Sequence, residues 1–258
     1  MDFDKIEKFV AKEYGINLSA YKSKQLIRRI ENFMQRVGAK NEIEFINILS
    51  MDKNISKKFL DHLTINVSEF FRNKDLFLDL ERKIKEHLNP EKNTLKIWSA
   101  ACSIGAEPYT LAIILDKITP NKKHNILATD IDQTVLEQAK QGIYNKNEVK
   151  NVDDDLLKKY FIQVQDKYQI IDEIKKRVIF KKHDLIMDSY ETGFDLIVCR
   201  NVVIYFTQET KNEIYRKFYT SLKPGGLLFV GATESIYNYR ELGFEKASTF
   251  IYRKPGGN

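Results

Sequence analysis

From Leu95 onward, short apolar runs alternate with segments of helical periodicity, and this alternation limits what the chain can fold into. The apolar runs are LKIWSAA (95–101), NILATD (125–130), RVIFKKHD (177–184), FDLIVCR (194–200) and LLFVGA (227–232). The segments between them predict helices near 107–117, 132–142 and 208–222. Because strands that alternate with helices are covered on both faces, the pattern predicts a mostly parallel sheet in an α/β domain.

Two stretches interrupt the alternation. Residues 160–180 predict short antiparallel strands inserted before the third parallel strand. Near the end of the sequence, FEKASTFIYR (244–253) predicts a hairpin that closes the sheet with an antiparallel strand. Residues 1–90, in contrast, carry helical patterns only, and the Asn-Pro pair at 89–90 is a stop signal. We therefore expect a helical N-terminal domain over residues 1–90 and an α/β domain over residues 91–258, with the inserted β subdomain at about 160–180.

Composition and charge indicate where the protein is located and what kind of partner it binds. The start, MDFDKIEKFV, lacks the pattern of a secretory signal, and no stretch reaches the roughly 18 apolar residues of a membrane span. Two cysteines in apolar segments are typical of a reduced protein, so we expect a cytoplasmic chain that does not insert into membranes. The net charge is only +6, but residues 20–40 hold six basic side chains against one acid. That density favours an acidic partner, either a protein or a nucleic acid.

The loop AACSIGAEP (100–108) follows the first strand, where open α/β sheets bind ligands. It has one glycine, Gly105, and neither the G-x-G-x-x-G run of dinucleotide sites nor the Lys-Ser/Thr pair of a P-loop. The loop therefore suits a ligand without phosphates, such as S-adenosylmethionine. Taken alone, Gly105 fits an ordinary tight turn better.

Acidic and polar residues follow the next strands. Asp130, after the second strand, could accept hydrogen bonds from both ribose hydroxyls, or it could cap the following helix, a role that Asp132 could fill instead. Asp184, after the third, could accept from an adenine amino group or be a solvated loop acid. Arg200 and Asn201 follow the fourth, buried strand, where polar groups are costly unless they serve a ligand or a helix cap. No proline follows Asn201, which argues against base amino groups as methyl acceptors.

Five ordered motifs together resemble one family, the chemotaxis receptor methyltransferases of the CheR type. The stretches are TINVSEFFRN (64–73), KIWSAACSIGAEPYTLA (96–112), ILATDID (126–132), DLIVCRNVVIYF (195–206) and SLKPGGLLFVGATE (221–234). The resemblance implies a Rossmann-like class I methyltransferase fold, S-adenosylmethionine as cofactor with S-adenosylhomocysteine as product, and glutamate side chains of chemoreceptors as substrates. The sequence departs from the family at Ala106, where an acid is usual, and at Ile104, where a threonine is usual.

Roles for individual residues follow from the resemblance. It implies cofactor contacts from Asn66, Ser68, Arg72, Gly105, Glu107, Asp130, Asp184, Leu185, Asn201 and Val202. It implies active-site roles for Arg72 and Tyr205. It also implies docking of the receptor's cytoplasmic methylation helices on basic residues of the N-terminal domain, namely Lys24, Arg28, Arg29 and Arg36.

The chemistry agrees with this family. A glutamate is already ionised at neutral pH, with an ordinary pKa of about 4.3, so its methylation needs no general base. The sequence has no Ser-His-Asp set and no metal-ligand spacing, and we expect no metal. Two other hypotheses stay open: an RNA or small-molecule methyltransferase, and a regulator that binds the cofactor without catalysis. Few aromatics lie near the basic residues, which disfavours nucleic acid as a partner.

Some family members grip a peptide tether at the receptor's C-terminus by adding its strand to the inserted sheet. Those members have an extra glycine in this region, which lets the peptide backbone approach closely. Here the loop QVQDKYQ (163–169) has none, and Lys175, Lys176 and Arg177 are expected to add charge near the edge. The sequence therefore predicts a member that binds no C-terminal pentapeptide.

Overall fold

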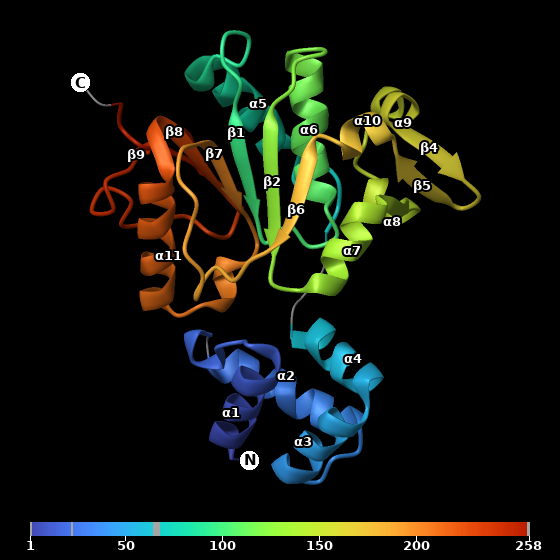
Figure 1. The fold of residues 1–258 in the computed structure, drawn as a ribbon. Helices are drawn as coiled ribbons and strands as arrows, with labels where there is room; N and C mark the ends of the chain where they lie inside the picture. Colours follow the sequence, from blue (N-terminus) through green and yellow to red (C-terminus); the bar gives the residue numbers. More distant parts are fainter. Residues whose placement is uncertain (1, 22, 64–67, 257–258) are drawn as a thin grey trace. The chain divides into compact units, whose positions relative to one another are not determined.

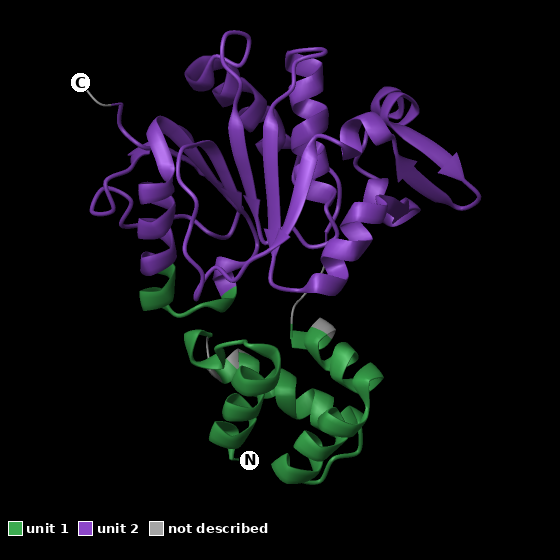
Figure 2. Ribbon diagram, in the orientation of Figure 1, with its two compact units in different colours: residues 1–66, 205–211 green, residues 67–204, 212–258 purple. Residues whose placement is uncertain are grey.

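The computed structural model describes residues 2–21, 23–63 and 68–256. They form two compact units, shown in green and purple in Figure 2. Unit 1 comprises residues 1–66 and 205–211, and unit 2 comprises residues 67–204 and 212–258. The division falls near residue 66, whereas stop signals in the sequence placed it near residue 90.

Unit 1 is a helical bundle. Its elements are α1 (Phe3–Tyr14), the 3₁₀ turn η1 (Leu18–Ala20), α2 (Ser23–Arg36), α3 (Glu42–Met51) and α4 (Lys53–Leu63). Phe33, Phe45 and Phe59 come from three helices, and their ring centroids lie 5.2–6.3 Å apart in the core. The expected helical periodicity of α2 is thus used to build this core.

A short segment from much later in the chain completes unit 1. Tyr21 and Phe206 form an isolated antiparallel bridge, and their ring centroids lie 4.9 Å apart. The backbone N–H of Thr207 donates to the carbonyl of Ala20 at 2.9 Å. Residues 205–211 therefore belong to the helical unit although they follow the fourth strand of the sheet.

Unit 2 is built on a seven-stranded sheet of order β6-β2-β1-β7-β8-β10-β9. Its strands are β1 (Lys96–Ala100), β2 (Asn125–Asp130), β6 (Val178–Lys182), β7 (Phe194–Cys199), β8 (Leu222–Val230), β9 (Glu245–Lys246) and β10 (Ile251–Arg253). The strands from β6 to β8 pair in parallel, while β10 is antiparallel to β8. The predicted Rossmann-like sheet, mostly parallel with an antiparallel last strand, is confirmed.

Helices pack around this sheet. They are α5 (Lys74–Leu88), α6 (Ala106–Ile118), α7 (Gln133–Gln141) and α11 (Gln208–Ser221). The 3₁₀ turn η2 (Val203–Tyr205) lies between β7 and α11 in the chain. The apolar face of α5, with Phe77, Leu80 and Ile84, lies in the same hydrophobic core as the strands. This burial explains why α5 belongs to unit 2, whereas its helical pattern alone grouped it with the N-terminal helices.

A second, three-stranded antiparallel sheet has the order β3-β5-β4. It consists of β3 (Ile143–Asn145), β4 (Phe161–Val164) and β5 (Lys167–Ile170), accompanied by α8 (Lys146–Val149), α9 (Asp154–Tyr160) and α10 (Asp172–Lys175). The predicted insert is confirmed, but it starts at residue 143, not 160. Residues 178–180, where the predicted insert overlapped the apolar run 177–184, belong to β6 of the main sheet, as that run predicted.

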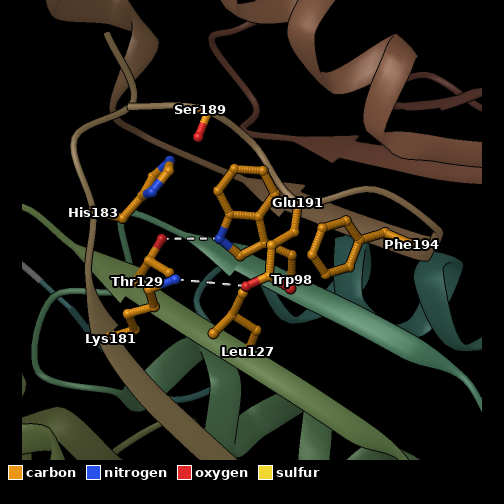
Figure 3. A pocket seen from close by; sticks show the side chains of 8 residues that line it. All are labelled: Trp98, Leu127, Thr129, Lys181, His183, Ser189, Glu191 and Phe194. Atoms are coloured by element: carbon orange, nitrogen blue, oxygen red, sulfur yellow. Dashed lines mark hydrogen bonds and ion pairs between the residues drawn. The ribbon is translucent and has the colours of Figure 1, made fainter. Parts of the chain in front are cut away.

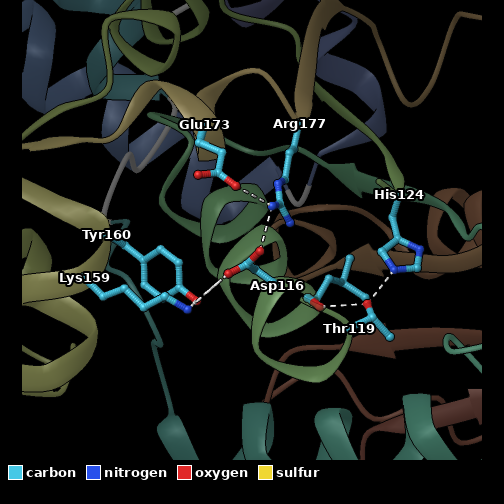
Figure 4. A network of polar contacts seen from close by, with 8 residues as sticks. Asp116, Thr119, His124, Lys159, Tyr160, Glu173 and Arg177 are labelled. Carbon is cyan, nitrogen blue, oxygen red and sulfur yellow. Dashed lines mark hydrogen bonds and ion pairs between the residues drawn. The ribbon is translucent and has the colours of Figure 1, made fainter. Parts of the chain in front are cut away.

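Asp116 on α6 holds this inserted region through a polar network (Figure 4). Its carboxylate accepts from Arg177 at 2.6 Å and from the Tyr160 hydroxyl at 2.8 Å, and Lys159 lies 3.3 Å away. Arg177 was expected to add charge at the edge of the small sheet. Instead its side chain is only 10% exposed, because it is paired with Asp116.

Within the described residues, no helix is long and apolar enough to cross a membrane.

Candidate cofactor and active site

Five non-glycine residues with positive φ lie in the segments after β1 and β7 and ahead of α5. They are Phe71 (φ 50°), Asn73 (φ 61°), Ala101 (φ 63°), Ser103 (φ 49°) and Asn201 (φ 60°). Left-handed backbone at such residues costs free energy and is concentrated in functional sites. The segments after β1 and β7 leave adjacent parallel strands at the switch point of the sheet order, where α/β folds bind ligands.

Asp130 ends β2 beside the loop after β1. Its carboxylate accepts from the Ser103 N–H at 2.8 Å and from the Asp132 N–H at 3.0 Å. Burial raises the pKa of Asp130, although these backbone donors act in the opposite direction. Asp132 caps α7, since its side chain accepts from the Thr134 N–H at 2.7 Å. The alternative that Asp130 caps this helix is therefore wrong.

Gly105 precedes α6 with φ 87°. A Cβ built on Gly105 would lie 2.8 Å from the Cβ of Ala139 on α7 and 3.3 Å from the Phe180 ring. Only glycine combines this conformation with such close packing. The glycine thus lets α7 approach the loop, a structural reason that goes beyond an ordinary tight turn.

Arg200 and Glu107 form a buried ion pair behind the loop. Nη1 of Arg200 lies 3.5 Å from a carboxylate oxygen of Glu107, and the two side chains are 2% and 15% exposed. The other carboxylate oxygen of Glu107 accepts from the Ser99 hydroxyl at 2.8 Å. Burial raises the pKa of Glu107, and the charge of Arg200 opposes that shift. Glu107, which we expected to contact the cofactor, is thus also the counter-ion of an arginine.

Arg72 stands in a turn between two residues of positive φ, Phe71 and Asn73. The Phe71 N–H donates to the Thr110 hydroxyl on α6 at 3.1 Å. The carbonyl oxygen of Arg72 accepts from Arg200 at 2.9 Å. The backbone that carries the predicted catalytic arginine is therefore fixed from two elements of unit 2.

Glu234 was part of a quoted motif but received no role from the sequence. It is 4% exposed, and its carboxylate accepts from the N–H groups of Gly231, at 2.9 Å, Asn201, at 2.5 Å, and Val202, at 2.9 Å. A Cβ on Gly231 would come within 2.3 Å of this carboxylate. Glu234 therefore fixes the left-handed turn that presents Asn201 and Val202. The available signal was an acid four residues after a buried strand, a weaker form of the signal that drew attention to Arg200.

Asp184 and Leu185 follow β6. The Asp184 carboxylate accepts from the Ile186 N–H at 2.7 Å in its own turn, and Leu185 is buried. The N–H of His183 donates to the Asp130 carbonyl at 2.9 Å, which ties this turn to the end of β2. The structure thus brings the Asp130 and Asp184 segments together.

A pocket is lined by residues on both sides of this turn in the chain, including His183 and Ser189 (Figure 3). Its lining residues are Trp98, Leu127, Thr129, Lys181, His183, Ser189, Glu191 and Phe194, none of which the sequence pointed to as site residues. The indole N–H of Trp98 donates to the Thr129 hydroxyl at 2.9 Å, and the rings of Trp98 and His183 pack edge to face. The ring contact holds His183, which immediately precedes the turn.

The remaining predicted residues have different placements. Asn66 lies outside the described residues, and Ser68 is half-buried just ahead of Phe70. Tyr205 ends η2 and belongs to unit 1, whereas Arg72 belongs to unit 2. Within the chain that the structure describes, no cluster of three or more His, Cys, Asp or Glu could hold a metal ion.

Of the four basic residues on α2, Lys24, Arg28 and Arg36 are exposed. Arg29 is half-buried, and its guanidinium donates to the backbone carbonyl of His62 on α4. Burial lowers the pKa of Arg29. This contact gives Arg29 a structural role inside unit 1.

Comparison with known proteins agrees with this geometry. Residues 66–251 match the family model "CheR methyltransferase, SAM binding domain", and residues 1–64 match "CheR methyltransferase, all-alpha domain". The chain belongs to the CheR methyltransferase family. Its relatives include proteins named chemotaxis protein methyltransferase from Listeria innocua (39% identical, over 98% of this chain and 97% of the relative) and from Escherichia coli (32% identical, over 97% and 89%).

Membership of the CheR family makes the chain an S-adenosylmethionine-dependent methyltransferase. The residues fit this cofactor: Asp130 is a buried acceptor at the end of β2, and the loop after β1 has none of the glycine-rich phosphate-binding patterns. The family models divide the chain at 64–66, in agreement with the two compact units.

Proposed function

We propose that this chain transfers methyl groups from S-adenosylmethionine to glutamate side chains in the cytoplasmic methylation helices of chemoreceptors. The observation that carries the proposal is the match, over nearly the whole length of both proteins, to chemotaxis protein methyltransferases. Both domains of the CheR family are present in this match.

The site suits a carboxylate acceptor. An ionised glutamate is itself the nucleophile, so the protein must position it and exclude water but need not remove a proton. When bound, S-adenosylmethionine supplies the methyl group on a sulfonium, which departs as the thioether S-adenosylhomocysteine. Arg72 can hold a carboxylate with two N–H donors, and we assign it to the acceptor or to the cofactor's own carboxylate. The family resemblance also implies an active-site role for Tyr205.

The decisive experiment measures methyl transfer from labelled cofactor to isolated receptor cytoplasmic domains and, separately, to RNA. We expect alkali-labile label on receptor glutamates, because a carboxylate ester hydrolyses in base. Label on RNA would favour the RNA methyltransferase, and cofactor binding without transfer to any acceptor would favour a regulator. In the same assay Arg72→Ala should lower turnover by about a hundredfold or more with the fold intact.

We further propose that receptors reach the enzyme through unit 1 without a C-terminal tether. The loop between β4 and β5 has no glycine, and its left-handed position is occupied by Gln165, with φ 56°. Because Arg177 is paired with Asp116, its charge no longer supports the proposal. The absence of glycine from this loop is therefore the main support.

The tether prediction is checked by titrating an aromatic-ended pentapeptide, alone and on a receptor tail, against the enzyme. We expect no binding up to millimolar peptide and equal methylation of full-length and tail-truncated receptors. Micromolar binding that competes with full-length receptor would contradict it.

A further inference from the structure

Arg200 connects three parts of unit 2 that the proposed function uses. It follows β7, it is ion-paired with Glu107 at the start of α6, and it donates to the turn that carries Arg72. We propose that Arg200 is a positioning residue that sets the catalytic geometry of Arg72. This inference rests on the role proposed for Arg72.

The surroundings of Arg200 leave its guanidinium almost no freedom. Its central carbon lies 4.8 Å from the ring centroid of Phe77 and 4.9 Å from that of Phe229. Such cation–π contacts gain strength where water is excluded, and the side chain is only 2% exposed. Phe77 belongs to α5 and Phe229 to β8, so both rings are themselves held in the core.

One end of this fixed group faces the turn before α5. Nη2 donates to the carbonyl oxygen of Arg72 at 2.9 Å and to Oδ1 of Asn73 at 3.1 Å. Both acceptors belong to the segment in which Phe71 and Asn73 adopt positive φ. Left-handed residues relax unless neighbouring groups hold them, and Arg200 supplies two of the bonds that do so.

The other end is neutralised by Glu107, with Nη1 3.5 Å from its carboxylate. Breaking a buried pair leaves an uncompensated charge, so the pair keeps Arg200 both ionised and oriented. A planar fork with several donors can serve both ends at once. Lysine, with a single ammonium, cannot reach the Arg72 carbonyl and Glu107 in the same geometry.

The charges are arranged so that Arg200 does not compete with Arg72 for the acceptor. Burial lowers the pKa of Arg200; the carboxylates of Glu107 and Glu234 oppose that shift, and the charge of Arg72 adds to it. With Arg200 paired inside the protein, the guanidinium assigned to the acceptor carboxylate is that of Arg72. Arg200 therefore holds the backbone of the turn, and Arg72 is the arginine assigned to the ligand.

The test compares Arg200→Lys with Arg177→Lys, each alone and combined with Arg72→Ala. Arg177 is a matched control, because it is also ion-paired in unit 2, with Asp116 as its partner and a side chain that is only 10% exposed. We expect Arg200→Lys to lower kcat for receptor methylation by about tenfold or more, and Arg177→Lys by less than about twofold at equal folded fraction. In the Arg72→Ala background, Arg200→Lys should lower the residual rate by less than about twofold, since groups that act as a unit are not additive.

A milder variant covers the case in which Arg200→Lys fails to fold. Asn73→Gly keeps the left-handed backbone but removes the Oδ1 that Arg200 contacts. Its kcat should fall by about threefold in wild type and remain unchanged with Arg72→Ala. Losses that multiply in the double variants, or a kcat for Arg200→Lys equal to that of Arg177→Lys, would overturn the inference. If Arg72→Ala alone retains full turnover, the proposed role of Arg72 fails instead.

Discussion

Asp130 is the residue on which cofactor binding should depend most. Replacing it with alanine removes a charged acceptor that we assign to the ribose hydroxyls, and it also frees the Ser103 N–H. We expect Asp130→Ala to lose about 2 kcal/mol or more of binding free energy for S-adenosylhomocysteine, measured by calorimetry. Asp132→Ala is the matched control, because it removes the same charge two residues away and takes the side-chain cap from α7 while leaving the Asp130 carboxylate in place. Equal affinity for wild type and Asp130→Ala would refute the ribose assignment.

A substitution at Gly105 measures how much the close packing of α7 against the loop after β1 contributes to stability. An alanine at Gly105 meets Ala139, whereas one at Gly193, with φ 80°, meets nothing within 4 Å. Both variants bear the strain of a positive φ, so their difference in unfolding free energy isolates the clash. We expect Gly105→Ala to be less stable than Gly193→Ala by about 1–3 kcal/mol in urea denaturation. Equal stability would mean that α7 moves aside freely.

At the residue scale, the sequence drew attention to Arg200 because a charged side chain directly after a buried strand is costly, and it offered a ligand or a helix cap as the reason. The structure gives Arg200 partners within the protein, namely Glu107 and the backbone carbonyl of Arg72. The partners themselves could not be predicted, because Glu107, Phe77 and Phe229 are distant in sequence and meet only through the packing of α5 and α6 on the sheet. For Glu107 the sequence suggested a cofactor contact, and its pairing with Arg200 required the fold.

At the scale of elements, α2 should carry receptor recognition. Lys24, Arg28 and Arg36 are exposed on it, and acidic methylation helices would be attracted to them in a salt-dependent way. Reversing Arg28 and Arg36 to Glu should raise the receptor KM by about tenfold at low salt, with cofactor affinity unchanged. The control reverses Lys57 and Lys58, which are exposed on α4 of the same unit and change the net charge equally. Equal receptor KM values for the two double variants would mean that Arg28 and Arg36 are solvated surface residues with no specific part in docking.

The anchorage of the small sheet should depend on pH through Asp116. Burial raises the pKa of Asp116, but the bonds from Tyr160 and Arg177 outweigh it and hold that pKa below the ordinary 3.8. A lowered pKa gives stability that is present above the ordinary value and lost as pH falls through the folded value. Asp116→Asn should therefore cost about 2–4 kcal/mol of unfolding free energy at pH 7, and this difference should shrink below about pH 4.

Urea denaturation followed by circular dichroism at pH 7 and pH 3 measures both quantities. Asp153→Asn is the control, because Asp153 pairs with Lys74 at the surface with its side chain 57% exposed, where such pairs contribute roughly 0–1 kcal/mol. A constant difference between Asp116→Asn and wild type at both pH values would contradict the linkage.

The long elements were predictable, since each has a clear period or apolar run. The start of the small sheet was not, because β3 has only three residues and carries no periodicity of its own. Likewise α5 has the same helical pattern as α1 to α4, and only the burial of Phe77, Leu80 and Ile84 against the sheet assigns it to unit 2. Local pattern specifies the type of an element but not the core that it joins.

On the scale of the whole molecule, the sequence predicted two domains, and the structure divides them in a way that a linear reading could not. The family matches place a boundary at 64–66, but unit 1 also takes residues 205–211 from beyond the fourth parallel strand. Such a return is invisible to composition, because residues 205–211 look like the loop and first turn of α11. It is specified by the partners of Phe206 and Thr207 in the first 21 residues.

The contribution of residues 205–211 to unit 1 limits how the protein can be divided into fragments or chimeras. A helical unit cut out at residue 66 would lack the bridge from Phe206 to Tyr21 and leave the Tyr21 ring without its edge-to-face neighbour. The helical unit is therefore not expected to be exchangeable between relatives as residues 1–66 alone. A chimera that borrows the helices of one relative must also borrow residues 205–211, four positions after Asn201 in the chain. With the receptor docking that we propose for unit 1, receptor preference and residues 205–211 are expected to be inherited together.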